Sequence, residues 1–212
     1  MKKIILLCVT ILAINLNAQV QNKFRVGLDV GYISAEKTDF GLSFALEPKF
    51  NIKKNMNIGL RLASVAAFRN AATFNNVTSA FLYGNSSILG TFDYYFVKPN
   101  ASFVPFIGGG IGLAVFENKF VTDVRDREQI KLNNTSSGLG LLVRGGFEYN
   151  KFRFGIDYNY VPSSNAAIDL KLYNYVNDPN DPAFINNSSV TFSNTYVGIH
   201  IGFYLGGGKW GK

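Results

Sequence analysis

Along most of this chain, apolar and polar residues alternate one by one. The alternation is strictest over residues 139–160, where one parity is apolar except for Gly145 and the other parity carries every charge. A repeat of two residues is the pattern of a β-strand with one apolar and one polar face, because successive side chains point to opposite sides. Two such runs meet at Asn150 and Lys151, and a two-residue polar connection predicts a tight antiparallel hairpin.

The same pattern predicts eight strands. They cover residues 24–33, 41–52, 57–68, 87–97, 103–116, 138–149, 152–161 and 191–205. No residue on the apolar parity of these segments is charged, whereas the opposite parity carries five basic and five acidic residues. These ten residues are Arg25, Asp29, Glu47, Lys49, Arg61, Asp93, Arg144, Glu148, Arg153 and Asp157.

Volume decides which face of the predicted sheet points inward. A lipocalin would show the same alternation with an apolar interior, but the interior of an eight-stranded barrel is just wide enough for side chains to fill. The large residues of the apolar parity would not fit there, and most strand glycines fall on the charged parity, where a narrow lumen is crowded. The pattern therefore predicts an all-β fold, an eight-stranded antiparallel up-and-down transmembrane β-barrel with an ionic lumen.

The connections support this orientation. Their predicted lengths alternate between short and long, as about seven residues, four, near 20, five, 21, two and nearly 30. Short turns at one end and long loops at the other are typical of an outer-membrane barrel, so we expect both termini to be periplasmic. Aromatic residues near the strand ends predict two girdles. One comprises Phe24, Phe50, Phe96, Phe103, Tyr149, Phe152 and Phe203, and the other comprises Tyr32, Phe68, Phe116, Tyr158 and Tyr160.

The N-terminus has the pattern of a secretory signal peptide over residues 1–18. Lys2 and Lys3 precede an apolar run that ends in a polar segment at Ala18. Because Cys8 lies in this run, the mature chain, residues 19–212, contains no cysteine for disulfides or thiolate ligands. It is predicted to be a single barrel domain with strands over about 24–205 and a short tail at 206–212.

The basic charge of the chain has a specific predicted location. The sequence has 21 Lys and Arg against 14 Asp and Glu, or 19 against 14 once Lys2 and Lys3 are removed. The periplasmic side of the predicted barrel carries only lysines: Lys23, Lys53, Lys54, Lys98, Lys151, Lys209 and Lys212. We interpret them as contacts to headgroups of the inner leaflet. A nucleic-acid surface is not expected, because it would need a continuous basic face with stacking aromatics.

Candidate chemistry within the lumen is limited. Equal numbers of buried acids and bases favour a salt-bridged plug over an open pore. His200 is the only histidine, so no metal site and no cofactor are expected. The glycines from Gly108 to Gly112 lie within a strand and lack the context of a nucleotide loop. Pro48 removes a ladder hydrogen bond, which predicts a bulge or an early end of the second strand.

Two segments resemble the small OmpA-like and OmpW-like outer-membrane barrels. The segment 103–113, Phe-Val-Pro-Phe-Ile-Gly-Gly-Gly-Ile-Gly-Leu, is similar to their fifth strand, and the resemblance spans residues 24–205. The last strand is similar to the signal that barrel-assembly machinery recognises, with Tyr196, Gly198, Ile201 and Phe203 at the matching positions. In many such proteins an aromatic residue is the last of the chain, whereas here residues 206–212 follow. The Asn-Ala-Gln sequence at 17–19 and the Gly/Lys tail resemble proteins of the Bacteroidetes.

This resemblance implies a location and a set of partners. The chain is expected in the outer membrane, in contact with its lipid and lipopolysaccharide, after handling by periplasmic chaperones and barrel-assembly machinery. The expected role is structural or surface-binding, through loops near 69–86, 117–137 and 162–190, with an unidentified extracellular ligand. The alternatives are a narrow OmpW-like channel for small hydrophobic solutes and, less favoured, a lipid A-modifying enzyme based on His200. No matching serine is evident, so an enzyme is not expected.

Overall fold

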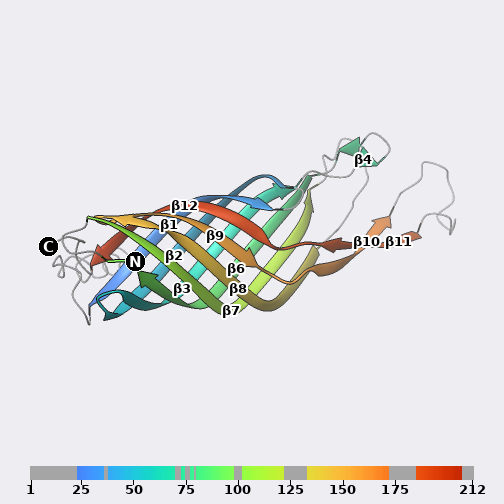
Figure 1. Cartoon of the computed structure of the whole chain (residues 1–212). Helices are drawn as coiled ribbons and strands as arrows, with labels where there is room; N and C mark the ends of the chain where they lie inside the picture. Colours follow the sequence, from blue (N-terminus) through green and yellow to red (C-terminus); the bar gives the residue numbers. More distant parts are fainter. Residues whose placement is uncertain are drawn as a thin grey trace, which may run out of the picture.

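The fold is a closed antiparallel β-barrel of eight strands (Figure 1). The computed structural model describes residues 23–35, 38–69, 73–74, 77–78, 80–97, 102–121, 133–171 and 185–206. The barrel strands are β1 (Phe24–Ala35), β2 (Thr38–Lys53), β3 (Met56–Arg69), β6 (Ala80–Tyr95), β7 (Phe103–Val121), β8 (Asn133–Tyr149), β9 (Phe152–Tyr160) and β12 (Tyr196–Gly206). Around the ring they follow the order β1-β12-β9-β8-β7-β6-β3-β2, and β1 pairs with β12 from Arg25–Gly206 to Ala35–Tyr196. The predicted fold class is confirmed.

The two ends of the barrel differ. At one end, which we call the turn end, β8 and β9 join through Asn150 and Lys151, and Asn150 adopts a left-handed conformation with φ 55°. The first described residues and Gly206 lie at the same end. At the opposite end, the loop end, β10 (Ser164–Lys171) and β11 (Ile185–Phe192) form a two-stranded sheet, and β4 (Thr73–Phe74) pairs with β5 (Val77–Thr78). Both small sheets lie beyond the barrel in Figure 1.

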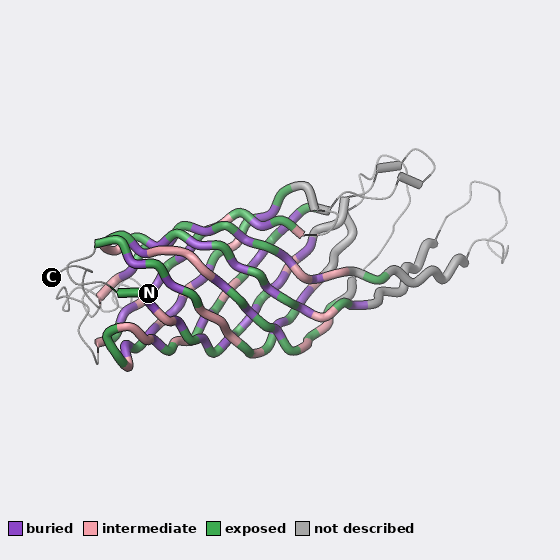
Figure 2. Tube along the Cα trace, in the orientation of Figure 1, coloured by how far each residue is buried: buried purple, intermediate pink, exposed green. Residues whose placement is uncertain are grey.

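The alternation of apolar and polar residues in the sequence corresponds to side chains that point alternately out of and into the barrel. Buried and exposed residues follow each other along the strands in Figure 2, and β9 shows this without interruption. Leu141, Phe154 and Ile199 are 40%, 36% and 61% exposed, on a surface made almost entirely of large apolar side chains. The charged parity faces the lumen. Because so large an apolar surface would be unstable in water, the exterior matches the hydrocarbon of a bilayer.

Several predicted boundaries were wrong at the loop end. The first connection spans residues 36–37 rather than about seven, since β1 and β2 continue to Ala35 and from Thr38. β6 begins at Ala80 rather than at 87, and β7 and β8 continue to Val121 and from Asn133. Residues 191–192 belong to β11, so the last barrel strand begins at Tyr196. Pairing with neighbouring strands extends the strands into these segments.

Pro48 does not produce the predicted bulge or early end. β2 continues to Lys53, and its register with β3 is the same at Leu46–Leu62 and at Lys49–Gly59. The ladder to β3 is only interrupted between these pairs, at Glu47 and Pro48, where proline lacks an N–H group. Pro48 still pairs with Val26 of β1, so the wall remains closed.

Part of the predicted organisation lies outside the described residues. This applies to the signal peptide at 1–18 with Cys8, to Lys98, and to the tail from 207 to 212. Within the part of the chain that the structure describes, no helix is long and apolar enough to cross a membrane.

Candidate functional site in the barrel lumen

All ten charged residues of the lumen parity are buried, each at most 5% exposed. They form two groups along the barrel. The turn-end charge group contains four basic and three acidic residues: Arg25, Glu47, Lys49, Asp93, Arg144, Glu148 and Arg153. The mid-lumen charge group contains Asp29, Arg61 and Asp157, with His200 beside Asp157. The turn-end group thus has a net charge of +1 and the mid-lumen group −1, so the lumen as a whole is neutral.

Glu47 is the centre of the turn-end charge group. Arg144 donates to both carboxylate oxygens of Glu47, at 2.6 and 3.0 Å, and Arg153 donates to one of them at 3.2 Å. The ammonium of Lys49 lies 3.2 Å away, and the Thr91 hydroxyl donates at 2.6 Å. A fully buried carboxylate is stable only when its charge and its lone pairs are satisfied in this way.

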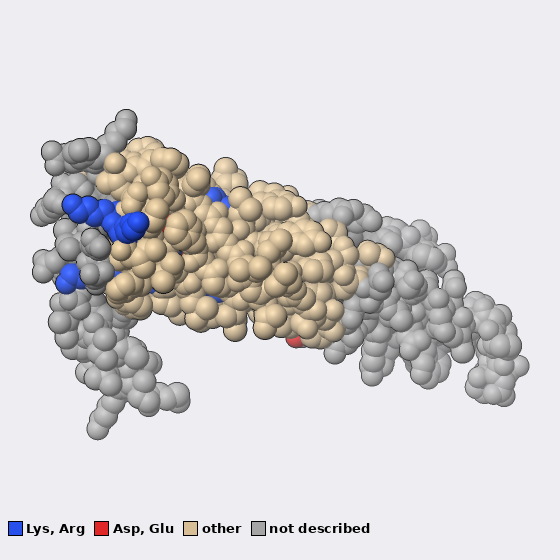
Figure 3. All heavy atoms as spheres, turned by 60° about the horizontal axis from the view of Figure 1, so that its bottom comes forward, with Lys and Arg blue, Asp and Glu red and all other residues tan. Residues whose placement is uncertain are grey.

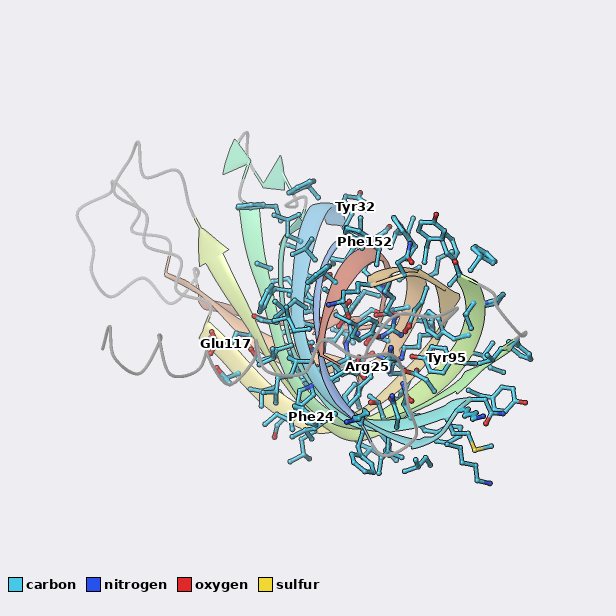
Figure 4. The ribbon with its side chains drawn as sticks, turned by 90° about the vertical axis from the view of Figure 1, so that its left-hand side faces the viewer. Phe24, Arg25, Tyr32, Tyr95, Glu117 and Phe152 are labelled. Atoms are coloured by element: carbon cyan, nitrogen blue, oxygen red, sulfur yellow. The ribbon has the colours of Figure 1, made fainter. Side chains whose placement is uncertain are left out.

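Two further carboxylates complete this group. Asp93 accepts from Arg144 at 2.8 and 3.0 Å and also from Lys49. Arg25 binds Glu148 through two parallel hydrogen bonds of 2.9 and 3.1 Å, the geometry that makes Arg–carboxylate pairs strong. Figure 4, a view along the barrel from the turn end, shows Arg25 within the ring of strands and Phe24 outside it.

Aromatic residues at the turn end hold the cations in place. The Tyr95 hydroxyl donates to Glu148 at 2.8 Å and also contacts Arg25, and the Tyr204 hydroxyl accepts from Arg153 at 2.9 Å. The guanidinium of Arg25 lies 4.0 Å from the centre of the Tyr204 ring. The guanidinium of Arg153 lies 4.1 Å from the centre of the Phe106 ring, so cation–π contacts add to the ion pairs.

Among the described residues, three interactions cross the full width of the barrel. β8 and β2 are four places apart in the ring of eight strands, as are β3 and β9, so each pair lies on opposite walls. Arg144–Glu47 joins the first pair and Arg61–Asp157, at 2.9 Å, joins the second. Near the loop end, the Tyr83 hydroxyl of β6 donates to the carbonyl of Asn194 at 3.0 Å, just before β12 on the opposite wall. These cross-bridges obstruct the lumen at three heights.

Apolar side chains close the lumen on both sides of the charges. Tyr95, Val104 and Phe106 pack together at the turn end. A second buried cluster near the loop end contains Ile33, Val65, Ala67, Tyr83, Ala114, Phe116, Val161 and Tyr196. Phe116 was predicted in the outer aromatic girdle, but it is 1% exposed and inside the barrel. The prediction was wrong because Phe116 shares the parity of Gly112 and Ala114, which face inward.

The mid-lumen charge group is less completely satisfied. Arg61 reaches Asp29 at 3.4 Å and Asp157 at 2.9 Å through one oxygen of each carboxylate. The second oxygens of Asp29 and Asp157 are buried without a hydrogen-bond partner, as are both ring nitrogens of His200. The His200 ring packs against Gly155, with Nδ1 3.4 Å from Asp157. No hydroxyl among the described residues is bonded to His200.

Glycines make room for the carboxylates. A side chain at Gly202 would overlap the carboxylate of Asp29, and one at Gly108 would overlap that of Asp93. At Gly146 and Gly112 a Cβ atom would instead overlap backbone carbonyls of the neighbouring strands, at Phe154 and Ile88. The glycines of the lumen parity therefore serve close packing of side chains and strands. Gly108 to Gly112 lie within β7, as expected for a wall segment.

Other predicted positions are distributed as follows. Tyr196 and Gly198 of the assembly-signal pattern face inward, whereas Ile201 and Phe203 are exposed to the outside at 44% and 36%. Among the described residues, no group of His, Cys, Asp or Glu could hold a metal ion. Five residues of the lumen network were not predicted from the sequence: Tyr95, Tyr204, Thr91, Tyr83 and Asn194. Tyr95, Tyr204 and Thr91 share the parity of the lumen charges within the predicted strands, which would have placed them inside, whereas Tyr83 lies outside the predicted strand 87–97.

Comparisons with known proteins agree with this fold. No protein-family model matches the chain, and no curated protein matches its sequence. The outer membrane protein OprG from Pseudomonas aeruginosa is similar in structure, with a TM-score of 0.50 and 14% identity over 91% of this chain and 100% of OprG. Neisserial surface protein A is similar with a TM-score of 0.48 and 14% identity, over 86% of this chain and 96% of that one. A major outer membrane protein of Thermus thermophilus gives 0.47 and 12%, over 86% and 99%.

The OprG structure agrees with the closed barrel described above. The chain has the architecture of the small outer-membrane β-barrels, and OprG covers nearly its whole length. At 14% identity the likeness extends to the fold alone. The resemblance to Bacteroidetes proteins stays a prediction.

Proposed function

We propose that this protein is an integral outer-membrane barrel with both termini on the periplasmic side. It acts as a closed structural or surface-binding element and not as a pore. The apolar exterior supports insertion in a bilayer. Short turns and both ends of the barrel chain at one end support the orientation, because outer-membrane barrels place short turns in the periplasm.

The set of cross-bridges is the observation that supports a closed lumen. Arg144–Glu47, Arg61–Asp157 and Tyr83–Asn194 each join opposite walls, and apolar clusters lie on both sides of the charges. Opening a water-filled path would break buried ion pairs, and breaking one such pair costs about 3–5 kcal/mol. A pathway for ions would therefore be closed at rest.

The loop-end elements supply the surface for binding. The β10–β11 sheet extends beyond the barrel and is fixed at its base by Asn194, whose side chain donates to the carbonyl of Pro162 at 2.8 Å and to the Ser164 hydroxyl at 3.2 Å. The Thr195 hydroxyl also donates to the Val161 carbonyl at 3.2 Å. A fixed base makes this sheet a rigid support for an extracellular contact, whose ligand is unidentified.

Conductance in planar lipid bilayers tests the closed state. Folded protein, verified by its heat-dependent shift on a denaturing gel, is expected to insert without producing current steps. A double variant, Arg61→Ala with Tyr83→Ala, removes two of the three cross-bridges and should increase the rate of brief openings. A regular single-channel step from the unmodified protein would contradict the proposal.

The alternative function is passage of small hydrophobic solutes through the wall. An apolar groove of about 650 Å³ on the outer wall favours it, since the groove reaches the inward-facing positions Gly31, Ser43 and His200. Its outer walls are Tyr32, Leu42, Phe44, Ala66 and Ile199. Entry of an apolar dye into protein-containing vesicles, blocked by Ala66→Trp and unchanged by Ala63→Ser inside the barrel, would support this alternative.

We also infer that the barrel is not an enzyme and that no cofactor is bound. The His200 ring packs on Gly155 and is not bonded to a hydroxyl. Replacing His200 with Ala should leave the mass spectrum of lipid A unchanged, and a changed acylation pattern would contradict this inference.

For assembly, we propose that Ile201 and Phe203 are read by the barrel-assembly machinery, because both side chains project from the outer face of β12. Delivery by periplasmic chaperones and contact with lipopolysaccharide follow from the proposed location. Phe203→Ala should slow insertion into the outer membrane in cells, whereas Leu28→Ala on the facing strand should slow it less.

A further inference from the structure

We propose that the rim of the turn end is a binding surface for anionic phospholipid headgroups. This proposal concerns the membrane contact of the barrel and does not depend on whether the loop end binds a ligand. Its central feature is a set of lysines at the turn end: Lys23, Lys53, Lys54 and Lys151. Lys53 and Lys54 are exposed, and Lys23 and Lys151 are half-buried. In Figure 3 the Lys and Arg side chains gather over this end.

The lysines occupy one continuous arc of the rim. Lys53 and Lys54 lie at the β2–β3 turn, and Lys23 precedes β1, where its carbonyl accepts from Asn51 of β2 at 3.0 Å. Lys151 lies in the β8–β9 turn, and its carbonyl accepts from Tyr204 of β12 at 2.9 Å. Since β9, β12, β1, β2 and β3 are consecutive in the ring, the arc covers about half of the rim.

No acid offsets this charge on the surface among the described residues. Glu47, Asp93 and Glu148 are the described acids of the turn end, and all three are buried and bound to lumen cations. The basic residues of the turn-end charge group are in turn paired with these acids inside the barrel. The rim lysines therefore present an unbalanced positive surface, which attracts a partner with several negative charges.

The position of the lysines identifies that partner as lipid. A girdle of exposed aromatic side chains lies directly beside them: Phe24, Phe50, Phe96, Phe103, Tyr149, Phe152 and Phe203. Aromatic girdles mark the interface between hydrocarbon and headgroups. Lys151 lies between Tyr149 and Phe152 in the chain, so its ammonium extends from the girdle to headgroup depth. Phosphate groups of anionic phospholipids are the negative charges available there.

Spin-labelled lipids test this surface directly. The mature protein is reconstituted in phosphatidylcholine bilayers, and the fraction of motionally restricted label is compared for phosphatidylglycerol and phosphatidylcholine. We expect a preference for phosphatidylglycerol of at least about threefold at low salt, decreasing at high salt because Lys53 and Lys54 are exposed. The variant Lys53→Gln, Lys54→Gln, Lys151→Gln should lose most of this preference.

A matched variant at the other end of the strands is the control. Arg69→Gln, Lys119→Gln, Lys171→Gln removes the same charge from the far ends of β3, β7 and β10 and should retain the preference. An unmodified protein without any preference, or a control variant that loses it, would overturn the proposal. So would a rim variant that keeps its lipid preference but no longer binds a soluble polyglutamate peptide, because the lysines would then serve a soluble acidic partner.

Discussion

Replacing Glu47 with Gln tests whether the lumen is as dry as its packing indicates. The change retains the shape of the side chain and removes the charge that Arg144, Arg153 and Lys49 share. Glu47 is fully buried, and its loss leaves Asp93 as the nearest anion of these cations. Since removing one partner from a buried ion pair costs about 3–5 kcal/mol, we expect a loss of that size in the free energy of unfolding.

Equilibrium unfolding in urea, in lipid or detergent, measures this loss. The only tryptophan, Trp210, lies after the last strand, so circular dichroism and the heat-dependent gel shift are better probes than its fluorescence. Glu117→Gln, the same chemical change at a half-buried position near the loop end, should cost less than about 1 kcal/mol. A loss below about 1 kcal/mol for Glu47→Gln would show that water screens the network, and the argument for a closed lumen would fail.

Combining Arg144→Met with Glu47→Gln measures the interaction between Arg144 and Glu47 apart from their other contacts. Each single replacement leaves the remaining member of the pair with one fewer partner, whereas the double variant Glu47→Gln with Arg144→Met removes both members of the cross-bridge. The double variant should therefore lose less stability than the two single variants added together. The interaction energy between two bonded residues is commonly about 0.5–3 kcal/mol, and we expect the upper part of that range here.

Two further predictions concern packing and the loop end. Gly146→Ala should destabilise the barrel by several kcal/mol, as judged by the gel shift, because the added methyl group overlaps the carbonyl of Phe154. At Gly90 an added methyl group meets nothing closer than 3.8 Å, so Gly90→Ala should change stability by less than about 1 kcal/mol. Equal effects of the two variants would refute this explanation. Tyr83→Phe removes the hydrogen bond to Asn194 and should lower the free energy of unfolding by about 1–3 kcal/mol. Hydrogen exchange should become faster only at the loop end of β12. An equal increase in exchange along all of β12 would contradict a local cross-bridge.

The sequence was sufficient to predict which residues face the lumen, because side-chain parity is a local property of a strand. It could not predict the partners of these residues. Arg144 and Glu47 are 97 positions apart, and their contact depends on the stagger between strands around the whole ring. The same holds for Tyr83 and Asn194, since Asn194 lies outside any strand and only the closed barrel brings it opposite β6.

The extent of the strands was underestimated for a related reason. Residues 84–87 and 133–137 are polar or small on both parities, and Phe81, Leu82 and Tyr83 are consecutive large residues, so the sequence offers no alternation there. Their strand structure comes from the ladders to β3 and β7. The strands of the β10–β11 sheet pair only with each other. The sequence pattern placed most of this sheet in a long loop. Local patterns therefore identified the part of the barrel that crosses the membrane, and pairing determined the part beyond it.

The most direct test of an apolar exterior with an ionic interior is a spin-label scan along β12, from Val197 to Tyr204, in lipid vesicles. Each residue is replaced by Cys and labelled, and the collision rates of the label with oxygen and with a water-soluble nickel complex are compared. The structure predicts a period of two, with Val197, Ile199, Ile201 and Phe203 accessible to oxygen and protected from nickel, and with the alternate positions protected from both. If Ile199 were protected from oxygen, or if the label at His200 met the nickel complex freely, the orientation of the barrel wall would be wrong.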